Sequence, residues 1–485
     1  MRYSTLIFIL CVQYLIAQSD GQSFTLEQII ALSQSDAPEV LLEKTELSRQ
    51  YWFLQQYKAS LRPQINLDAT LPNVNHTIDL ITLPNGSGQY INRSLMNNDL
   101  SLSLNQVLPF SGGRVFLASG LNRLDIFKTS LVQPSVSYLG RPLFVGFTQP
   151  LFRYNNWKWD KAIRPLQYAE ATKKFSENLE SLALKSVTLF FDLLVAQLEE
   201  QAVRSNKTNA DTLYELNKSR FKVGKIAESE LLQSEINSMN TDVDLSQAGL
   251  DVSTANEKLR NFLGIQKSIS FELITPNDLP DLHIDPNQAI EYARQNRSVF
   301  TSHELKRLEA EASYDQAKKN QQANINLSGN LGLTQTGSRV SDALRNPLDQ
   351  EIIRLDIGIP IADWGKAKAN KEIASSNLTL VNQTISQEKS NLEQEISLKV
   401  KQFDLKKERV KIAQRASEAS QKRYFFSTQR YLIGKVGIVE LSQAIDDQNK
   451  SRKAYFSALR DYWIAYYEIR KLTLFDFITN EKIKK

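Results

Sequence analysis

Side chains that catalyse reactions or bind metals are sparse in this chain of 485 residues. The three histidines, His76, His283 and His303, are far apart in the sequence, and His303 lacks the second histidine that a zinc-binding helix needs. The single cysteine, Cys11, lies in the N-terminal apolar segment, so the rest of the chain has no thiol for nucleophilic or metal chemistry. The sequence therefore predicts a protein that is not an enzyme and that uses no metal and no cofactor.

Two charged motifs recur at an interval of 210 residues. They are Arg220-Phe221-Lys222-Val223-Gly224-Lys225 and Arg430-Tyr431-Leu432-Ile433-Gly434-Lys435. In each motif the glycine can adopt the left-handed conformation that ends a helix. Glu230 and Glu440 follow the motifs, and a carboxylate in the first turn of the next helix offsets the helix dipole. The motifs predict the tips of two helical hairpins.

The motifs belong to a larger internal repeat. Gln64-Ile65-Asn66-Leu67 lies 260 residues before Asn324-Ile325-Asn326-Leu327, and Gln149-Pro150 lies 210 residues before Ile359-Pro360. Two intervals indicate two copies of one unit, with 50 additional residues between about Thr70 and Phe147 of the first copy. Such a duplication strongly constrains the architecture.

Long helices are predicted to lead to each tip. In the segment from Trp157 to Val223, apolar residues recur every seven positions, at Leu182, Leu189, Ala196, Val203 and Ala210. The second copy, from Lys366 to Ile433, has the same spacing at Ile396, Phe403 and Val410. At about 1.5 Å per residue each helix would be about 100 Å long, which is too long for a globular core. Returning helices are predicted at Glu228–Leu263 and Ile438–Leu474, and a further helix at Thr25–Leu61, which Pro63 stops.

Alternating apolar and polar residues predict β-strands between the helices. Ile65, Leu67 and Ala69 alternate with polar neighbours, and the same pattern appears around Leu102, Leu117, Val145, Ile325 and Ile357. Strands of about ten residues with one apolar and one polar face are typical of a barrel wall between lipid and water. The strands alone also allow a soluble sandwich or barrel.

The N-terminus has the layout of a secretory signal peptide. Arg2 precedes an apolar run from Leu6 to Ile16, and cleavage is expected near Ala17. An uncleaved anchor is the alternative. Leu10 stands where a lipoprotein site needs a small residue, so we expect no lipidation at Cys11.

Composition excludes several other classes of protein. Apolar residues make up 41% of the chain and the mean hydropathy is -0.36, and no later stretch approaches the roughly 20 apolar residues of a membrane helix. The net charge of +5 arises from 59 basic and 54 acidic residues that are mixed along the helices. Because nucleic-acid binding needs basic residues clustered on one face, we expect no nucleic-acid partner.

The ordered set of motifs resembles the TolC family of outer-membrane efflux proteins. The strands of one chain cannot close a wide barrel, and open strand edges are excluded from a bilayer, so several chains must share one barrel. The resemblance rests on the two tips and on the strand ends Thr148-Gln149-Pro150-Leu151-Phe152, Gly358-Ile359-Pro360-Ile361 and Asp363-Trp364-Gly365-Lys366. It implies a mainly α fold with β: a homotrimeric outer-membrane β-barrel with four strands per protomer, continued by a long α-helical periplasmic barrel and built from two internal repeats.

The expected domain limits follow from this resemblance. They are 1–17 signal peptide, 18–64 first-repeat helix, 65–152 first-repeat strands with an extra hairpin, 153–265 first long helical hairpin, 266–322 linker and second-repeat helix, 323–362 second-repeat strands, 363–475 second long hairpin and 476–485 tail. The 50 additional residues could widen or line the barrel, or form an extracellular plug-like elaboration. If they join the wall, each chain supplies six strands instead of four.

The resemblance also implies a gate at the tips. It places a latch tyrosine at Tyr431 with its acidic partner at Glu230, and an acidic ring that meets cations at Glu440, with Gln443 where a second carboxylate is often found. The arginine that commonly braces this closure falls on Val436. Three glutamates around a narrow pore would attract cations and be blocked by them.

The implied function is an outer-membrane exit duct of a tripartite efflux or type I secretion system in a Gram-negative bacterium. Small molecules or polypeptides would pass through it from an inner-membrane pump of the RND, ABC or MFS class. A periplasmic adaptor would dock at the tips, at Gly224, Lys225, Gly434 and Lys435. The alternatives are a periplasmic coiled-coil scaffold or adaptor, which would not need strands that face lipid, and a monomeric porin, which would need more strands and fewer helices.

Overall fold

The structure is a computed structural model that describes residues 23–82, 84, 86–128, 133–267, 269–276 and 280–483. The expected signal peptide, with Cys11, and the last two residues of the C-terminal tail lie outside the described residues. The chain forms two compact units. Unit 1 comprises the residues up to Ser48, Glu170–Phe300 and the residues from Gln387 onward, and unit 2 comprises Arg49–Ala169 and Thr301–Ser386.

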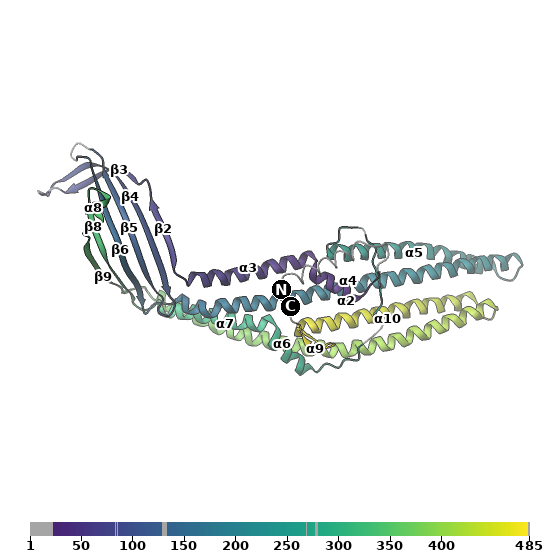
Figure 1. Cartoon of the computed structure of the whole chain (residues 1–485). Coiled ribbons are helices and arrows are strands. Elements are labelled where there is room, and N and C mark those ends of the chain that lie inside the picture. Colours follow the sequence, from purple (N-terminus) through teal and green to yellow (C-terminus); the bar gives the residue numbers. More distant parts are fainter. Residues whose placement is uncertain are drawn as a thin grey trace. The chain divides into compact units, whose positions relative to one another are not determined.

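The helices carry the internal repeat almost residue for residue (Figure 1). At the shorter interval, which is that of the tip motifs, α4 (Asn156–Lys222) and α5 (Glu228–Leu263) recur as α9 (Lys366–Leu432) and α10 (Ile438–Thr473). At the longer interval, α2 (Leu26–Ser35) and α3 (Pro38–Ser60) recur as α6 (Pro286–Asn296) and α7 (Ser298–Lys319). Because the helices recur at the intervals of the sequence motifs, the predicted duplication is confirmed. Among the described residues, none of the helices combines the length and the apolarity that crossing a membrane requires.

The first predicted helix, Thr25–Leu61, is in fact two helices. Thr25 begins α2 with a capping box, in which its hydroxyl accepts from the N–H of Gln28 and the Gln28 side chain accepts from the N–H of Thr25. Pro38 opens α3, because a proline lacks the N–H that a helix interior needs but is tolerated in the first turn. The prediction of one continuous helix is wrong at this point.

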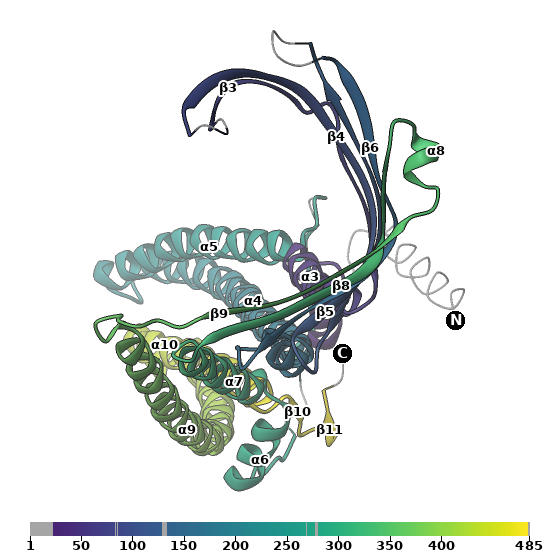
Figure 2. The same ribbon diagram turned by 90° about the vertical axis from the view of Figure 1, so that its left-hand side faces the viewer.

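Unit 2 contains one antiparallel sheet, whose strands lie side by side in the order β2-β4-β5-β6-β8-β9 (Figure 2). Their bounds are β2 (Gln64–Thr70), β4 (Gly88–Leu108), β5 (Gly113–Ile126), β6 (Ser135–Leu151), β8 (Asn324–Gly337) and β9 (Leu348–Gly358). β3 (Val74–Thr82) lies off this path and pairs with the first part of β4. The short helix α8 (Val340–Ala343) lies in the connection between β8 and β9.

The additional residues of the first copy lie within the sheet. β4 and β5 are inserted between β2 and β6, whereas β8 and β9 pair directly in the second copy. The pairing of β4 with β5 runs without a shift from Leu95↔Ile126 to Leu108↔Gly113. One chain therefore supplies six strands to the path of the sheet, as expected if the additional residues join the wall, and not the four strands that the resemblance alone implies.

The sheet has one apolar and one polar face. Ile65, Leu104, Leu117, Val145 and Leu331 stand directly opposite one another on successive strands and therefore share a face. Their neighbours along the strands, which include asparagine and serine residues of β2 and β4, lie on the other face. The apolar face is exposed in the single chain, with Leu67 67% and Leu102 50% accessible. A continuous exposed apolar face suits contact with lipid.

Unit 1 is held together by an aromatic core. Phe190 of α4, Phe403 of α9, and Tyr462 and Tyr466 of α10 are among its largest fully buried side chains. The rings of Phe403 and Tyr462 have centroids 5.0 Å apart. The Tyr462 hydroxyl donates to the carbonyl of Pro280 at 3.0 Å, and burial raises the pKa of Tyr462 to about 12. The hydroxyl is therefore a permanent donor at physiological pH.

A buried ionic network attaches the C-terminal segment to this core. Arg470 Nε donates to Glu180 Oε2 at 2.8 Å, and Arg470 Nη1 donates to Asp476 Oδ2 at 2.8 Å. Tyr466 also donates to Asp476, at 2.6 Å. Glu180 is fully buried, so Arg470 supplies the charge that burial of this carboxylate requires. The network joins α4, α10 and β10 (Phe475–Asp476), and β10 pairs with β11 (Glu481–Lys482). A second short strand pair is formed by β1 (Ser23–Phe24) and β7 (Glu272–Leu273).

Candidate functional site

The tips of the two helical hairpins have the same backbone geometry. Gly224 and Gly434 have φ angles of 68° and 74°, in the left-handed region that favours glycine. The N–H of Lys225 donates to the carbonyl of Arg220 at 2.9 Å, and the N–H of Lys435 donates to the carbonyl of Arg430 at 2.9 Å. A Cβ atom at either glycine would meet nothing within 4 Å, so the φ angle, and not lack of space, requires glycine.

The tips present cationic and apolar side chains to solvent. Lys225 and Lys435 are exposed directly after the glycines. Val223 and Ile433, directly before them, are each 66% exposed. An exposed β-branched side chain beside a lysine on each tip gives two equivalent surfaces that combine apolar contact with positive charge.

Tyr431 is buried between the two hairpins. Its hydroxyl donates to Oδ1 of Asn217 in α4 at 2.8 Å, and both side chains are almost inaccessible to solvent. Glu230, the partner that the resemblance implies, is exposed in the first turn of α5. The partner of Tyr431 in this structure is therefore Asn217 and not Glu230, because Asn217 lies on the buried face of α4.

Arg220 adds two contacts to the same junction. Its guanidinium carbon lies 5.5 Å from the centre of the Tyr431 ring, and Nη2 donates to the carbonyl of Leu432 at 3.1 Å. The arginine therefore joins the end of α4 to the end of α9 through both a cation–π contact and a hydrogen bond.

The other expected gate residues lie on the exposed side of the second hairpin. Glu440 forms an ion pair with Arg430 at 3.7 Å, and both side chains are about half exposed. Gln443 is exposed and its side-chain amide donates to Asp447 Oδ1 at 2.9 Å. Because exposed ion pairs are screened by water, the Arg430–Glu440 pair leaves the carboxylate available to a soluble cation.

Val436 contributes to an apolar cluster at the position where the resemblance implies an arginine. Tyr431, Ile438 and Leu441 form the buried part of this cluster, and Val436 packs against them together with Leu213, Tyr424 and Ile445. The brace at this position is therefore apolar. The nearby ionic contacts come from Arg220 and Arg430 instead.

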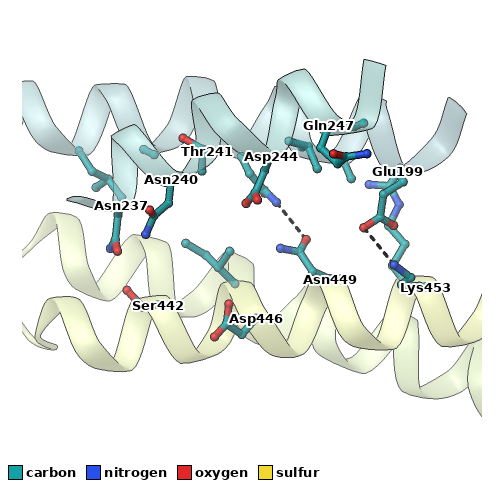
Figure 3. Close-up of a pocket in the computed structure, with 18 of the residues that line it drawn as sticks. Glu199, Asn237, Asn240, Thr241, Asp244, Gln247, Ser442, Asp446, Asn449 and Lys453 are labelled. Carbon is teal, nitrogen blue, oxygen red and sulfur yellow. Dashed lines mark hydrogen bonds and ion pairs between the residues drawn. The ribbon is translucent and has the colours of Figure 1, made fainter. Parts of the chain in front are cut away.

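A polar groove of about 550 Å³ lies between α4, α5 and α10 (Figure 3). In Figure 3, Asn240 and Asp244 of α5 face Asp446 and Asn449 of α10. Asn206 Nδ2 of α4 donates to Asn449 Oδ1 at 3.1 Å, and Lys453 Nζ lies 3.8 Å from Glu199. Among the described residues, no group of three or more histidine, cysteine, aspartate or glutamate side chains is arranged to hold a metal ion.

Charged contacts within the first hairpin lie next to this groove. Lys207 Nζ of α4 lies 2.6 Å from Asp211 and 3.0 Å from Asp242 of α5. Hydrogen bonding to Asp211 and then to Asp242 raises the pKa of Lys207, and the hydrogen bond from Lys207 lowers the pKa of Asp211. Charged groups thus join α4 to α5 at this point, whereas the groove is crossed by neutral amides, a hydrogen bond from Arg452 to the carbonyl of Leu198 and one long ion pair.

Asn217 and Tyr424 are site residues that the sequence analysis did not identify. The Tyr424 hydroxyl accepts from Asn209 Nδ2 at 2.8 Å, which gives a third neutral hydrogen bond between the hairpins, besides Tyr431–Asn217 and Asn206–Asn449. The interval of seven could have indicated both residues. Asn217 follows Ala210 by seven positions, and Tyr424 and Tyr431 continue the series that contains Val410.

Comparison by sequence identifies one family. The model of the family described as "outer membrane efflux protein" matches residues 142–265 and 289–473, which together make up more than half of the chain. No curated protein matches the chain.

Comparison of structures finds the same fold in bacterial outer-membrane channels. The Campylobacter jejuni CmeC outer membrane channel is 15% identical with a TM-score of 0.68, and the alignment covers 95% of this chain and 87% of CmeC. The open state of the Neisseria gonorrhoeae MtrE outer membrane channel is 13% identical with a TM-score of 0.61, covering 92% and 88%. The Vibrio cholerae outer membrane protein VceC is 11% identical with a TM-score of 0.59, covering 95% and 97%. At these identities the likeness shows the fold.

Proposed function

Because the chain belongs to the outer membrane efflux protein family, we propose that three copies of it form the exit duct of a tripartite efflux or type I secretion system. The duct is passive, and an inner-membrane pump of the RND, ABC or MFS class supplies the energy. Small molecules or polypeptides pass from the pump through the helical part of the duct and leave through the barrel. The host is a Gram-negative bacterium, with the barrel in its outer membrane and the helices in its periplasm.

The sheet of unit 2 is the observation that carries this proposal. Among the described strands, β2 and β9 each pair on one side only, so the sheet has two free edges. The exposed apolar face suits a bilayer, but the free edges cannot persist there, because each backbone polar group needs a partner. Pairing between copies removes the edges. With six strands from each chain, three copies supply eighteen strands.

The contacts of the tip residues support a gate at the mouth of the duct. Tyr431, held by Asn217 and Arg220, fixes the second hairpin against the first. Glu440 lies on the exposed side of α10 with Gln443 beside it, and Glu230 has the equivalent place in α5. Glu440 and Glu230 supply carboxylates at the mouth. Opening separates the hairpins at the neutral contacts across the groove, a shift between two packings of the same helices.

The tip surfaces support docking of a periplasmic adaptor. Gly224 and Gly434 give both hairpins the same turn, and Lys225 and Lys435 place a cation at the same position on each. A partner with acidic and apolar side chains on a helical hairpin would match both surfaces. Two similar surfaces in each chain allow six related contacts around a trimer.

Membrane fractionation of cells that express the full chain tests the proposal. The protein should remain in the outer-membrane fraction after a salt wash, and it should migrate as a trimer in mild detergent. A periplasmic scaffold or adaptor would instead be released by salt or be found with the inner membrane. Either result would contradict the exit duct.

A further inference from the structure

The two free edges of the sheet carry some of the most exposed apolar side chains of unit 2. Ile65 and Leu67 of β2 are 72% and 67% exposed. On the other edge, Ile359 is 65% and Ile361 is 98% exposed, just after the end of β9. The duct proposed above needs a partner for both edges, but it does not determine which residues meet.

The internal repeat provides a template for this pairing. Within the chain, β6 ends the strands of the first copy and pairs with β8, which begins those of the second, with Gln149 opposite Leu327 and Leu151 opposite Ile325. At the intervals of the repeat, β9 is the counterpart of β6 and β2 is the counterpart of β8. A closed ring of repeats places β9 of one chain beside β2 of the next in the same way that β6 lies beside β8.

We propose that β9 and β2 of neighbouring chains form an antiparallel seam in which Ile359 is opposite Leu67 and Ile361 is opposite Ile65. In the internal repeat, Ile359 and Ile361 are the counterparts of Gln149 and Leu151, and Leu67 and Ile65 are the counterparts of Leu327 and Ile325. The proposed pairs therefore reproduce the observed pairs Gln149–Leu327 and Leu151–Ile325. The inference rests on the proposed trimeric duct and adds the register of its subunit contact.

The faces of the sheet support this register independently. Ile65 belongs to the row of opposed residues that continues through Val145 and Leu331 to Glu351 of β9. Because alternate residues of a strand share a face, a continuation of β9 through Ile361 would place Ile359 and Ile361 on the same face as Ile65 and Leu67. A shift of the seam by one residue would place each isoleucine opposite a residue of the polar face.

The ends of the strands give a second line of support. β6 continues through Pro150 to Leu151, where β8 pairs with it, but the equivalent β9 ends at Gly358. The seam would extend β9 by three residues and give Ile359 and Ile361 backbone partners. It would also place four of the most exposed apolar side chains of unit 2 beside each other on the apolar face.

Disulfide cross-linking in outer membranes tests the register. The only native cysteine is Cys11 in the expected signal peptide, so Leu67→Cys with Ile359→Cys introduces one defined pair. Mild oxidation should give covalent dimers and trimers on denaturing gels. The control variants combine Leu67→Cys with Ile357→Cys or with Ile361→Cys, which are diagonal neighbours in the proposed register. Their yield should be at least about tenfold lower, because diagonal neighbours are too far apart for a disulfide. Ile65→Cys with Ile361→Cys is a second pair that should behave in the same way.

An intramolecular pair is the matched control. Gln149→Cys with Leu327→Cys has the same place in the repeat within one chain, so it should form a disulfide without any covalent oligomer. Preferential cross-linking of a shifted pair would overturn the register. If the control forms its disulfide and the protein is a detergent-resistant outer-membrane trimer, but neither seam pair cross-links, the seam is wrong while the duct stands. A protein that is absent from the outer membrane would contradict the duct itself.

Discussion

The phenol of Tyr431 in α9 donates a 2.8 Å hydrogen bond to Oδ1 of Asn217 in α4, and this bond joins the two hairpins near their tips. Both side chains are buried and neither is charged. Salt therefore screens the contact little, and its strength depends on how well the two hairpins exclude water. For the proposed gate, movement of the helices should therefore break this contact more readily than a change of salt concentration.

Removal of the Tyr431 hydroxyl should favour the open channel. In Tyr431→Phe, Oδ1 of Asn217 loses its donor, at a cost of about 1 kcal/mol to the closed packing. In planar bilayers the fraction of open channels should rise about fivefold. In a double-mutant cycle, Tyr431→Phe should couple with Asn217→Ala but be additive with Glu230→Ala. Coupling to Glu230 and none to Asn217 would show that the partner is wrong.

Glu440 should control block by divalent cations. Glu440→Gln removes the charge with little change in shape, so the concentration that blocks half the current should rise roughly tenfold if three carboxylates share the bound ion. Glu418→Gln is the control, because Glu418 is exposed on α9 away from the tip, and it should leave the block unchanged. An unchanged block in Glu440→Gln would remove Glu440 from the gate.

Charge reversal at the second tip should weaken the adaptor without destabilising the channel. Lys435 is exposed, so Lys435→Glu should lower adaptor binding and leave the melting temperature of the trimer unchanged. Lys450 is also exposed but lies on α10, farther from the tip. The variant Lys450→Glu makes the same charge change and should bind the adaptor normally. Equal loss of binding in both variants would point to a general effect of charge.

Loss of the buried carboxylate of Glu180 should destabilise unit 1. In Glu180→Gln, Arg470 keeps its buried charge but loses one of its two carboxylate partners, and we expect a loss of about 3 kcal/mol in the free energy of unfolding. Glu199→Gln is the control, because Glu199 forms a longer and more exposed ion pair with Lys453, and it should change stability by less than about 0.5 kcal/mol. Thermal unfolding in detergent measures both. Similar melting temperatures for the two variants would contradict the role of Glu180.

The contribution of Asp476 should depend on pH. Burial alone would raise the pKa of Asp476, but the hydrogen bond from Tyr466, the charge of Arg470 and two backbone N–H groups together lower it. A carboxyl whose pKa is lower in the folded state stabilises the fold above its unfolded pKa of about 4 and loses that effect as the pH falls through its folded pKa. Asp476→Asn should therefore lower the melting temperature at pH 7, and the difference should shrink below about pH 4. A difference that grows in acid would contradict this assignment.

The sequence by itself determined the elements of the fold and their duplication. The repeated motifs predicted the two hairpins, and the helices of the structure recur at the same two intervals as the motifs. Alternation around Leu67, Leu102 and Leu117 predicted strands with one apolar face. These features are local: a turn needs its glycine, and a half-buried helix or strand needs apolar residues at a fixed period.

Only the tertiary structure decided which of these elements meet. Alternation shows that β4 and β5 are strands, but many sheet orders satisfy it, and backbone pairing alone places them between β2 and β6. Similarly, the spacing of residues in α9 puts Tyr431 on a buried seam without naming its partner. The rotation of α4 about its axis brings Asn217 to the phenol, whereas Glu230 lies in solvent on α5, because contacts between helices depend on how their side chains interlock and not on distance along the chain.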